Sequence, residues 1–268
     1  MAYEKSIGAN NPSMILMLVD QSGSMDESFS GSDKRTHAAQ AVNRVIYEII
    51  QNSQKGDGYS DRCYIGVIGY GENVDLLVGG MVSEVNDHPL DIVQIPQKTG
   101  DGAGGLVDTI LTMGVWVTPK AENGTPMAEA FEMAYGLLEN WIANHPDCFP
   151  PVVFNISDGM PNDKNKARNN ALSIMQLSTS DGNVLFFNAH IQEAPYEQIV
   201  LPSDSNYLEE EAKFLFDISS IIPEVMAKKA SAVGFTPKEG ARAFVYKASA
   251  ENLIKLLTFG STVTGFRR

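Results

Sequence analysis

Continuous apolar runs alternate along this chain with stretches in which apolar residues recur every three or four positions. The runs lack the strict apolar–polar alternation of a half-exposed strand, so they predict strands that are buried on both faces. The first run, MILMLVD, ends abruptly at a carboxylate, Asp20. The predicted strands cover residues 14–20, 63–71, 151–159, 183–191 and 241–249.

Helical periodicity is clearest in residues 126–142. Pro126 stands there in the first turn, where a helix tolerates proline. One face of this segment carries an apolar stripe formed by Met127, Ala130, Phe131, Ala134, Leu137, Leu138 and Trp141. The same spacing predicts further helices over residues 36–50, 163–178, 212–230 and 250–260, with a break at Pro223.

The alternation of strands with helices predicts an α/β fold with a doubly wound, mainly parallel sheet and helices on both faces. Residues 74–80 follow the second strand after a short turn, which predicts an antiparallel hairpin at one edge of the sheet. No internal repeat or composition shift divides the chain, so we expect a single domain over residues 1–268. Residues 82–124, with scattered proline and glycine, are expected to form an irregular insertion packed on that domain, and polar residues 202–211 a loop.

Composition adds restrictions on partners and location. The 268 residues are 43% apolar and 20% charged, as in soluble globular proteins, and the net charge is −13. That charge argues against nucleic acid and anionic membranes as partners. The run from Met14 to Val19 is too short for a signal peptide or a membrane span. Together with Cys63 and Cys148, which we interpret as buried free thiols, this leads us to expect a cytoplasmic protein.

Polar oxygen donors follow directly on the first strand. Asp20, Ser22 and Ser24 alternate around Gly23, and alternate residues of an extended segment face the same way. Thr125 lies just before the helix over residues 126–142, and Asp158 ends a later strand. Ligands of parallel α/β sheets collect at the carboxyl ends of the strands, so these five residues are expected to converge.

The predicted set contains two carboxylates and three hydroxyls, with no cysteine or histidine. Hard oxygen donors suit Mg²⁺ or Mn²⁺ and suit Zn²⁺ poorly, while Ca²⁺ is a weaker candidate. Two carboxylates nearly neutralise a dication, and the hydroxyls donate little charge. The metal would therefore stay electrophilic and favour an Asp or Glu carboxylate from a partner protein.

This ordered set resembles the metal-ion-dependent adhesion site (MIDAS) of the von Willebrand factor A domain family. The resemblance covers roughly residues 10–260. It implies that Ser22, Ser24 and Thr125 bind the metal directly and that Asp20 and Asp158 often act through water. It also implies an open coordination position for a ligand carboxylate, and a role in prokaryotic signalling, stress or defence assemblies.

The function that we predict is therefore a non-catalytic, metal-dependent protein-binding module. Met25 and Met160 each lie beside a predicted ligand loop, so they are candidates for an adaptable apolar rim around the partner. Ordinary core packing is an equally good explanation for both methionines.

An enzymatic alternative comes from haloacid-dehalogenase-type phosphatases, which place a nucleophilic Asp after the first strand. Residues 158–163, DGMPND, fit a later motif of that family. However, Ser22 stands where a general acid is expected. No Lys or Arg occurs between Thr125 and Asp158 to stabilise phosphoryl charge.

Two plainer alternatives concern single motifs. Each polar piece taken alone fits a turn or a helix cap, since Asp, Ser and Thr satisfy backbone groups locally. Gly100, Gly102 and Gly105 match G-x-G-x-x-G, but a dinucleotide site needs that motif immediately after a strand. Four residues intervene here after a short apolar stretch, which favours a flexible loop.

Overall fold

A seven-stranded sheet forms the centre of the computed structural model, which describes residues 3–100, 105–192 and 198–263. The strand order is β14-β15-β13-β10-β1-β6-β7. All neighbours pair in parallel except at the two edges. The strands are β1 (Ser13–Asp20), β6 (Cys63–Tyr70), β7 (Val74–Met81), β10 (Val152–Ser157), β13 (Leu185–His190), β14 (Ile199–Val200) and β15 (Phe244–Tyr246).

The chain winds from β1 in both directions. It first adds β6 and β7 on one side and then returns to add β10, β13 and β15 on the other. The sheet is therefore doubly wound, and β1 and β10 flank the point where the strand order reverses. In open α/β sheets that reversal leaves a crevice beyond the carboxyl ends of the strands.

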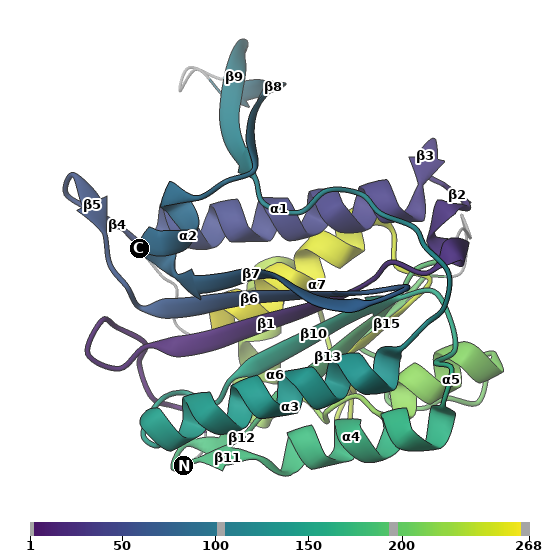
Figure 1. Cartoon of the computed structure of the whole chain (residues 1–268). Helices are drawn as coiled ribbons and strands as arrows, with labels where there is room; N and C mark the ends of the chain where they lie inside the picture. The colour runs from purple at the N-terminus through teal and green to yellow at the C-terminus, as the bar shows by residue number, and fades with distance from the viewer. Residues whose placement is uncertain (1–2, 101–104, 193–197, 264–268) are drawn as a thin grey trace.

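Helices cover both faces of the sheet (Figure 1). One face carries α1 and α7, and the other carries α3 and α4. The helices are α1 (Lys34–Asn52), α2 (Val82–Asp87), α3 (Met127–Asn144), α4 (Lys164–Gln176), α5 (Glu210–Asp217), α6 (Glu224–Lys229) and α7 (Ala250–Val263), with short 3₁₀ helices η1 (Gly23–Asp26) and η2 (Ala230–Val233). No helix in the described part of the chain is long and apolar enough to cross a membrane.

The side chains of β1 supply both halves of the core. Ile15, Met17 and Val19 pack with α1 and α7, while Leu16 and Leu18 pack with α3 and α4. Every residue of β1 is buried. This explains why the strand is continuously apolar rather than alternating.

The antiparallel edge strand predicted at residues 74–80 is confirmed as β7. The other edge ends in a second antiparallel strand, the two-residue β14, which we did not predict. The helical segment predicted over residues 212–230 divides into α5 and α6, and α6 begins directly after Pro223.

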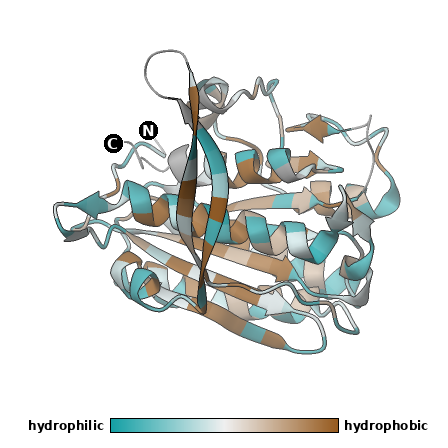
Figure 2. Cartoon of the chain, turned by 90° about the horizontal axis from the view of Figure 1, so that it is seen from above, coloured by the Kyte–Doolittle hydropathy of each residue, from teal (hydrophilic) through white to brown (hydrophobic). Residues whose placement is uncertain are grey.

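The expectation of an irregular insertion at residues 82–124 was wrong. After α2 this segment forms a long antiparallel hairpin, β8 (Asp91–Gly100) and β9 (Leu106–Val115), which we call the arm. The arm stands away from the body instead of packing on it (Figure 1), and apolar and polar residues are interspersed along it (Figure 2). Three further pairs of two-residue strands close local turns: β2 (Ser28–Phe29) with β3 (Ser32–Asp33), β4 (Gln54–Lys55) with β5 (Gly58–Tyr59), and β11 (Ser178–Thr179) with β12 (Gly182–Asn183).

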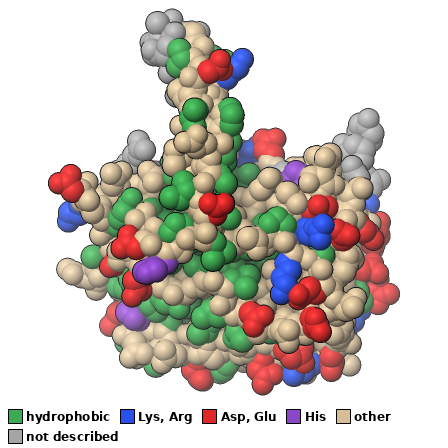
Figure 3. All heavy atoms as spheres, turned by 45° about the horizontal axis from the view of Figure 1, so that its top comes forward, with side chains coloured by type: hydrophobic (Ala, Val, Ile, Leu, Met, Phe, Trp, Pro, Cys, Tyr) green, Lys and Arg blue, Asp and Glu red, His purple; other side chains and the backbone are tan. Residues whose placement is uncertain are grey.

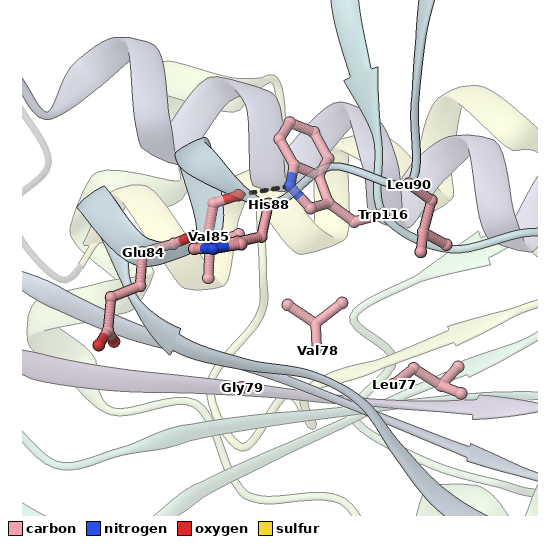
Figure 4. Close-up of a pocket in the computed structure, with 8 residues that line it drawn as sticks. All are labelled: Leu77, Val78, Gly79, Glu84, Val85, His88, Leu90 and Trp116. Atoms are coloured by element: carbon pink, nitrogen blue, oxygen red, sulfur yellow. Dashed lines mark hydrogen bonds between the residues drawn. The ribbon is translucent and has the colours of Figure 1, made fainter.

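A buried asparagine holds the foot of the arm. The Asn43 side chain accepts hydrogen bonds from the backbone N–H groups of Trp116 and Val117, both at 2.9 Å, and donates to the Val117 carbonyl at 2.8 Å. The Trp116 indole donates to the Val85 carbonyl at 2.7 Å, which ties the arm to α2 (Figure 4). The arm therefore leaves the body at a fixed point.

Exposed apolar side chains continue from the arm onto the edge of the sheet (Figure 3). Leu106 and Ile110 on the arm are 70% and 64% exposed. A cavity of about 330 Å³ lies at the foot of the arm. It is lined by Leu77, Val78, Gly79, Glu84, Val85, His88, Leu90 and Trp116 (Figure 4).

Candidate metal centre

Asp20 is the last residue of β1 and is only 1% exposed, so its carboxylate is buried. Its Oδ1 accepts a hydrogen bond from the Ser22 backbone N–H at 2.9 Å, and its Oδ2 accepts one from the Ser157 hydroxyl at 2.6 Å. Burial raises the pKa of Asp20 to about 6, although these hydrogen bonds favour the charged form. An added cation would compensate for this cost of burial.

Two hydroxyls and a second carboxylate meet above Asp20. The Oγ atoms of Ser22 and Ser24 lie 3.1 Å apart, and the Ser24 hydroxyl donates to Oδ1 of Asp158 at 2.8 Å. Ser22 precedes η1 and Ser24 lies within it, so this short helix turns both hydroxyls toward the loop after β10. The structure thus joins the D-x-S-x-S segment to Asp158, as the sequence predicts.

A lysine that sequence reasoning did not select also reaches this cluster. Lys34, the first residue of α1, is 5% exposed. Its ammonium donates to Oδ2 of Asp158 at 2.6 Å and to Oε2 of Glu27 at 2.7 Å. Burial disfavours the ammonium, but the hydrogen bonds to Asp158 and Glu27 outweigh burial, and the pKa of Lys34 is raised.

Thr125 approaches through its loop, immediately before α3. Its backbone N–H donates to Oδ1 of Asn162 at 3.1 Å, and the Asn162 N–H donates back to the Thr125 carbonyl at 3.0 Å. The same loop donates from Glu122 N–H to the Gln21 carbonyl at 2.6 Å. These bonds tie the loop of Thr125 to the loops after β1 and after β10, which carry Ser22, Ser24 and Asp158.

The two proposed rim methionines have different environments. Met25 is completely buried and belongs to the core around α1, so its assignment to an exposed rim was wrong. Its position inside η1, whose other residues face outward, turns it into the core. Met160 is half-buried and packs against the core on the side of α3 and α4.

Sequence reasoning missed four residues that contact the predicted site residues: Ser157, Lys34, Glu27 and Asn162. Ser157 directly precedes Asp158, so its place at the strand end was a usable signal. Lys34 gave no such signal, because a lysine at the start of a helix is ordinarily solvated.

A polar row crosses the sheet beneath this cluster. The Tyr70 hydroxyl donates to Oδ1 of Asn155 at 2.7 Å, and Nδ2 of Asn155 donates to Oδ1 of Asn188 at 3.0 Å. Asn188 in turn donates to the Ser219 hydroxyl at 3.0 Å, which donates to the Leu215 carbonyl. The row links β6, β10, β13 and the end of α5 through groups that are all buried.

The chemistry of this cluster fits a hard dication. The described residues contain no group of three or more His, Cys, Asp or Glu side chains placed to hold a metal, so a metal here needs the serine hydroxyls. The Ser24 hydroxyl already lies within hydrogen-bond distance of both the Ser22 hydroxyl and the Asp158 carboxylate. Such an all-oxygen set suits Mg²⁺ or Mn²⁺ completed by water.

No protein-family model and no curated protein matches the chain. Among solved structures, proximal thread matrix protein 1 from the mussel byssus matches 96% of this chain and 47% of its own at 12% identity, with a TM-score of 0.51. A further structure of that mussel protein is described as having a zinc-occupied MIDAS motif. The fold is that of a von Willebrand factor A domain.

Other solved structures with lower scores include the ArnB paralog VWA2 from Sulfolobus acidocaldarius. It matches 68% of this chain and 36% of its own at 14% identity, with a TM-score of 0.37. The chain spans between 20% and 61% of the length of the first five structures found. At these identities the likeness concerns the von Willebrand factor A fold alone.

The structure also bears on the two rival motifs. Gly100 ends β8 and Leu106 begins β9, so the G-x-G-x-x-G segment spans the tip of a hairpin and not a strand-to-helix turn; Gly102 lies outside the described residues. A phosphatase of the haloacid-dehalogenase type needs a cation between Thr125 and Asp158, and the sequence has none there. Lys34 supplies one from elsewhere, but it pairs with Asp158 and not with the candidate nucleophile Asp20.

Proposed function

We propose that Asp20, Ser22, Ser24, Thr125 and Asp158 hold a single Mg²⁺ or Mn²⁺ ion, and that this centre binds a protein partner. The hydrogen bond from Ser24 to Asp158 carries the proposal, because it joins two strand ends that are far apart in the sequence. The hydroxyls of Ser22, Ser24 and Thr125 would bind the ion directly. Asp20 and Asp158 would hold water molecules on it or neutralise its charge.

The partner would supply an Asp or Glu carboxylate. Three carboxylates of the cluster, from Asp20, Asp158 and Glu27, are balanced by the Lys34 ammonium and a dication, so the loaded centre is close to neutral. Neutral hydroxyls leave the ion electrophilic on its open side. An anionic oxygen from outside is then the favoured ligand.

A binding role accounts for Asp20 better than a catalytic one. Both of its oxygens accept hydrogen bonds inside the protein, and it is almost fully buried. A nucleophile would need one oxygen free and accessible to a phosphoryl group.

The free thiols of Cys63 and Cys148, both buried, suit a reducing compartment, and we keep the cytoplasm as the proposed location.

Calorimetric titration with Mg²⁺ and Mn²⁺ tests the centre. We expect Ser24→Ala to weaken metal binding at least tenfold, while Ser28→Ala, at an exposed serine nearby, leaves it unchanged. Undetectable binding by the wild-type protein, with and without a carboxylate ligand, would remove the basis of the proposal.

Two further measurements separate binding from catalysis. Capture of partners in Mg²⁺ and in chelator should differ if the centre binds protein. Hydrolysis of a generic phosphate ester that depends on Mg²⁺ and disappears in Asp20→Asn would show an enzyme and overturn the binding role.

A further inference from the structure

Lys34 is held beside the proposed metal centre by a closed loop. Its backbone N–H donates to the Glu27 carbonyl at 3.1 Å, and its ammonium donates to the carboxylate of the same residue at 2.7 Å. The hairpin of β2 and β3 lies between these two residues. Phe29 of that hairpin is buried and makes an edge contact with the His37 ring on α1, with centroids 5.0 Å apart. Lys34 is therefore a fixed cation and not a solvated surface lysine.

Both oxygens of Asp158 are engaged in this arrangement. Oδ1 accepts from the Ser24 hydroxyl at 2.8 Å and Oδ2 accepts from the Lys34 ammonium at 2.6 Å. The side chains of Lys34 and Asp158 are 6% and 1% exposed, so water screens their attraction weakly. A dication that uses Asp158, directly or through water, must share that carboxylate with the ammonium.

Glu27 is a second carboxylate partner of Lys34. Its side chain is 68% exposed, so it can follow the ammonium at little cost in packing. When Asp158 turns toward a metal, Lys34 can remain paired with Glu27. The ammonium would then stay beside the centre, where it would repel the dication and attract an anion.

We propose that Lys34 is a tethered cation that competes with the metal for Asp158 and shifts the centre from metal affinity toward affinity for an anionic ligand. This inference rests on the proposed function and adds a residue that determines its specificity. The ammonium lowers the affinity for the ion alone. It adds positive charge that favours a carboxylate once the ion is bound, so ion and carboxylate bind cooperatively.

The test compares Lys34→Met, which keeps the length of the side chain and removes its charge, with Lys34→Arg, which keeps the charge. In calorimetric titration with Mn²⁺, we expect Lys34→Met to bind at least tenfold more tightly than the wild-type protein and Lys34→Arg to stay within threefold. With Mn²⁺ saturating, acetate should bind at least threefold more weakly to Lys34→Met. These opposite changes would not arise from loss of structure.

Glu27→Gln provides a second variant at an exposed side chain. It leaves Asp158 as the remaining carboxylate partner of Lys34 and should weaken Mn²⁺ binding several-fold. Asp26→Asn removes the same charge one residue away, where the carboxylate pairs with Arg35 instead, and should change little.

The outcomes separate the two proposals. One outcome is that Ser24→Ala loses Mn²⁺ binding while a folded Lys34→Met protein binds Mn²⁺ as the wild type does or more weakly. This outcome would overturn the role of Lys34 and leave the centre intact. If Lys34→Met does not fold, equal effects of Glu27→Gln and Asp26→Asn would overturn it. Absence of Mn²⁺ binding in every variant would overturn the centre, and the inference with it.

Discussion

The Ser157 hydroxyl donates a 2.6 Å hydrogen bond to Oδ2 of Asp20, and this bond joins the ends of the neighbouring strands β1 and β10. Both side chains are buried, so no bulk water can replace the hydroxyl if it is removed. The position of the Asp20 carboxylate beneath the serine hydroxyls thus depends on a residue outside the D-x-S-x-S segment.

Replacing Ser157 with alanine should destabilise the metal-free protein by about 1–3 kcal/mol, because a buried carboxylate oxygen loses its partner. Urea unfolding in chelator at pH 7 measures this change. Ser28→Ala, at an exposed serine, should stay within about 0.5 kcal/mol of the wild type. A loss of stability equal in the two variants would contradict the assigned role of Ser157.

The pH dependence of stability should contain two opposing contributions. Burial lowers the pKa of His190 to about 4. The contribution of His190 to the free energy of unfolding is therefore complete above pH 6.5 and is lost as the pH falls through about 4. Burial raises the pKa of Asp20 to about 6. The contribution of Asp20 to the free energy of unfolding is therefore complete below pH 3.8 and is lost as the pH rises through about 6. Between pH 4 and 6 the two contributions, each on the order of 3 kcal/mol, largely cancel.

Single variants should expose each contribution in metal-free protein. Relative to the wild type, Asp20→Asn should gain stability as the pH rises from 4 to 6, and His190→Gln should lose it. Unfolding by urea at half-unit steps of pH provides the comparison. Parallel curves for both variants and the wild type would show that neither group titrates as its burial predicts.

The arm should depend on Asn43 for its attachment. Asn43→Ala removes three hydrogen bonds and leaves the buried N–H groups of Trp116 and Val117 without their acceptor. We expect a loss of about 3 kcal/mol in unfolding free energy and faster amide exchange at both residues. Asn144→Ala, at the exposed end of α3, is the control and should leave both quantities nearly unchanged.

Exposed side chains on the arm should influence solubility more than stability. The double substitution Ile92→Thr with Ile110→Thr removes two side chains that are 62% and 64% exposed. Threonine retains the preference for strands, so the unfolding free energy should change by less than about 0.5 kcal/mol. Binding of the dye ANS should fall, and a large destabilisation would show that these side chains are packed.

The apolar pattern of the sequence was sufficient to predict the central strands and the long helices. Continuous apolar runs were enough to predict the buried strands β1, β6, β10 and β13, and apolar residues at helical spacing were enough to predict the helices α1 and α3. Residues 82–124 gave no such signal, because the arm has no core to face. Its strands alternate weakly, and Pro96 together with the glycines at the tip made a loop the natural interpretation.

The candidate site was only partly accessible from sequence. Residue types and strand ends indicated Asp20, Ser22, Ser24 and Asp158, and the structure brings these together. Lys34 could not be predicted, since its role depends on a hairpin that returns the chain to Asp158. Met25 was misplaced for a related reason, because the direction of one side chain in a short 3₁₀ turn has no periodicity to reveal it.

The polar row from Tyr70 through Asn155 and Asn188 to Ser219 also limits how the strands can move. If β10 slid by one residue along its neighbours, the Asn155 side chain would face the opposite layer, and Tyr70 and Asn188 would lose their hydrogen-bond partner in the buried core. The row thus acts as a lock on strand register. Asp158 and Asp20 stand at the ends of strands that cannot slip past each other, so any change in this site has to come from the loops and from α1.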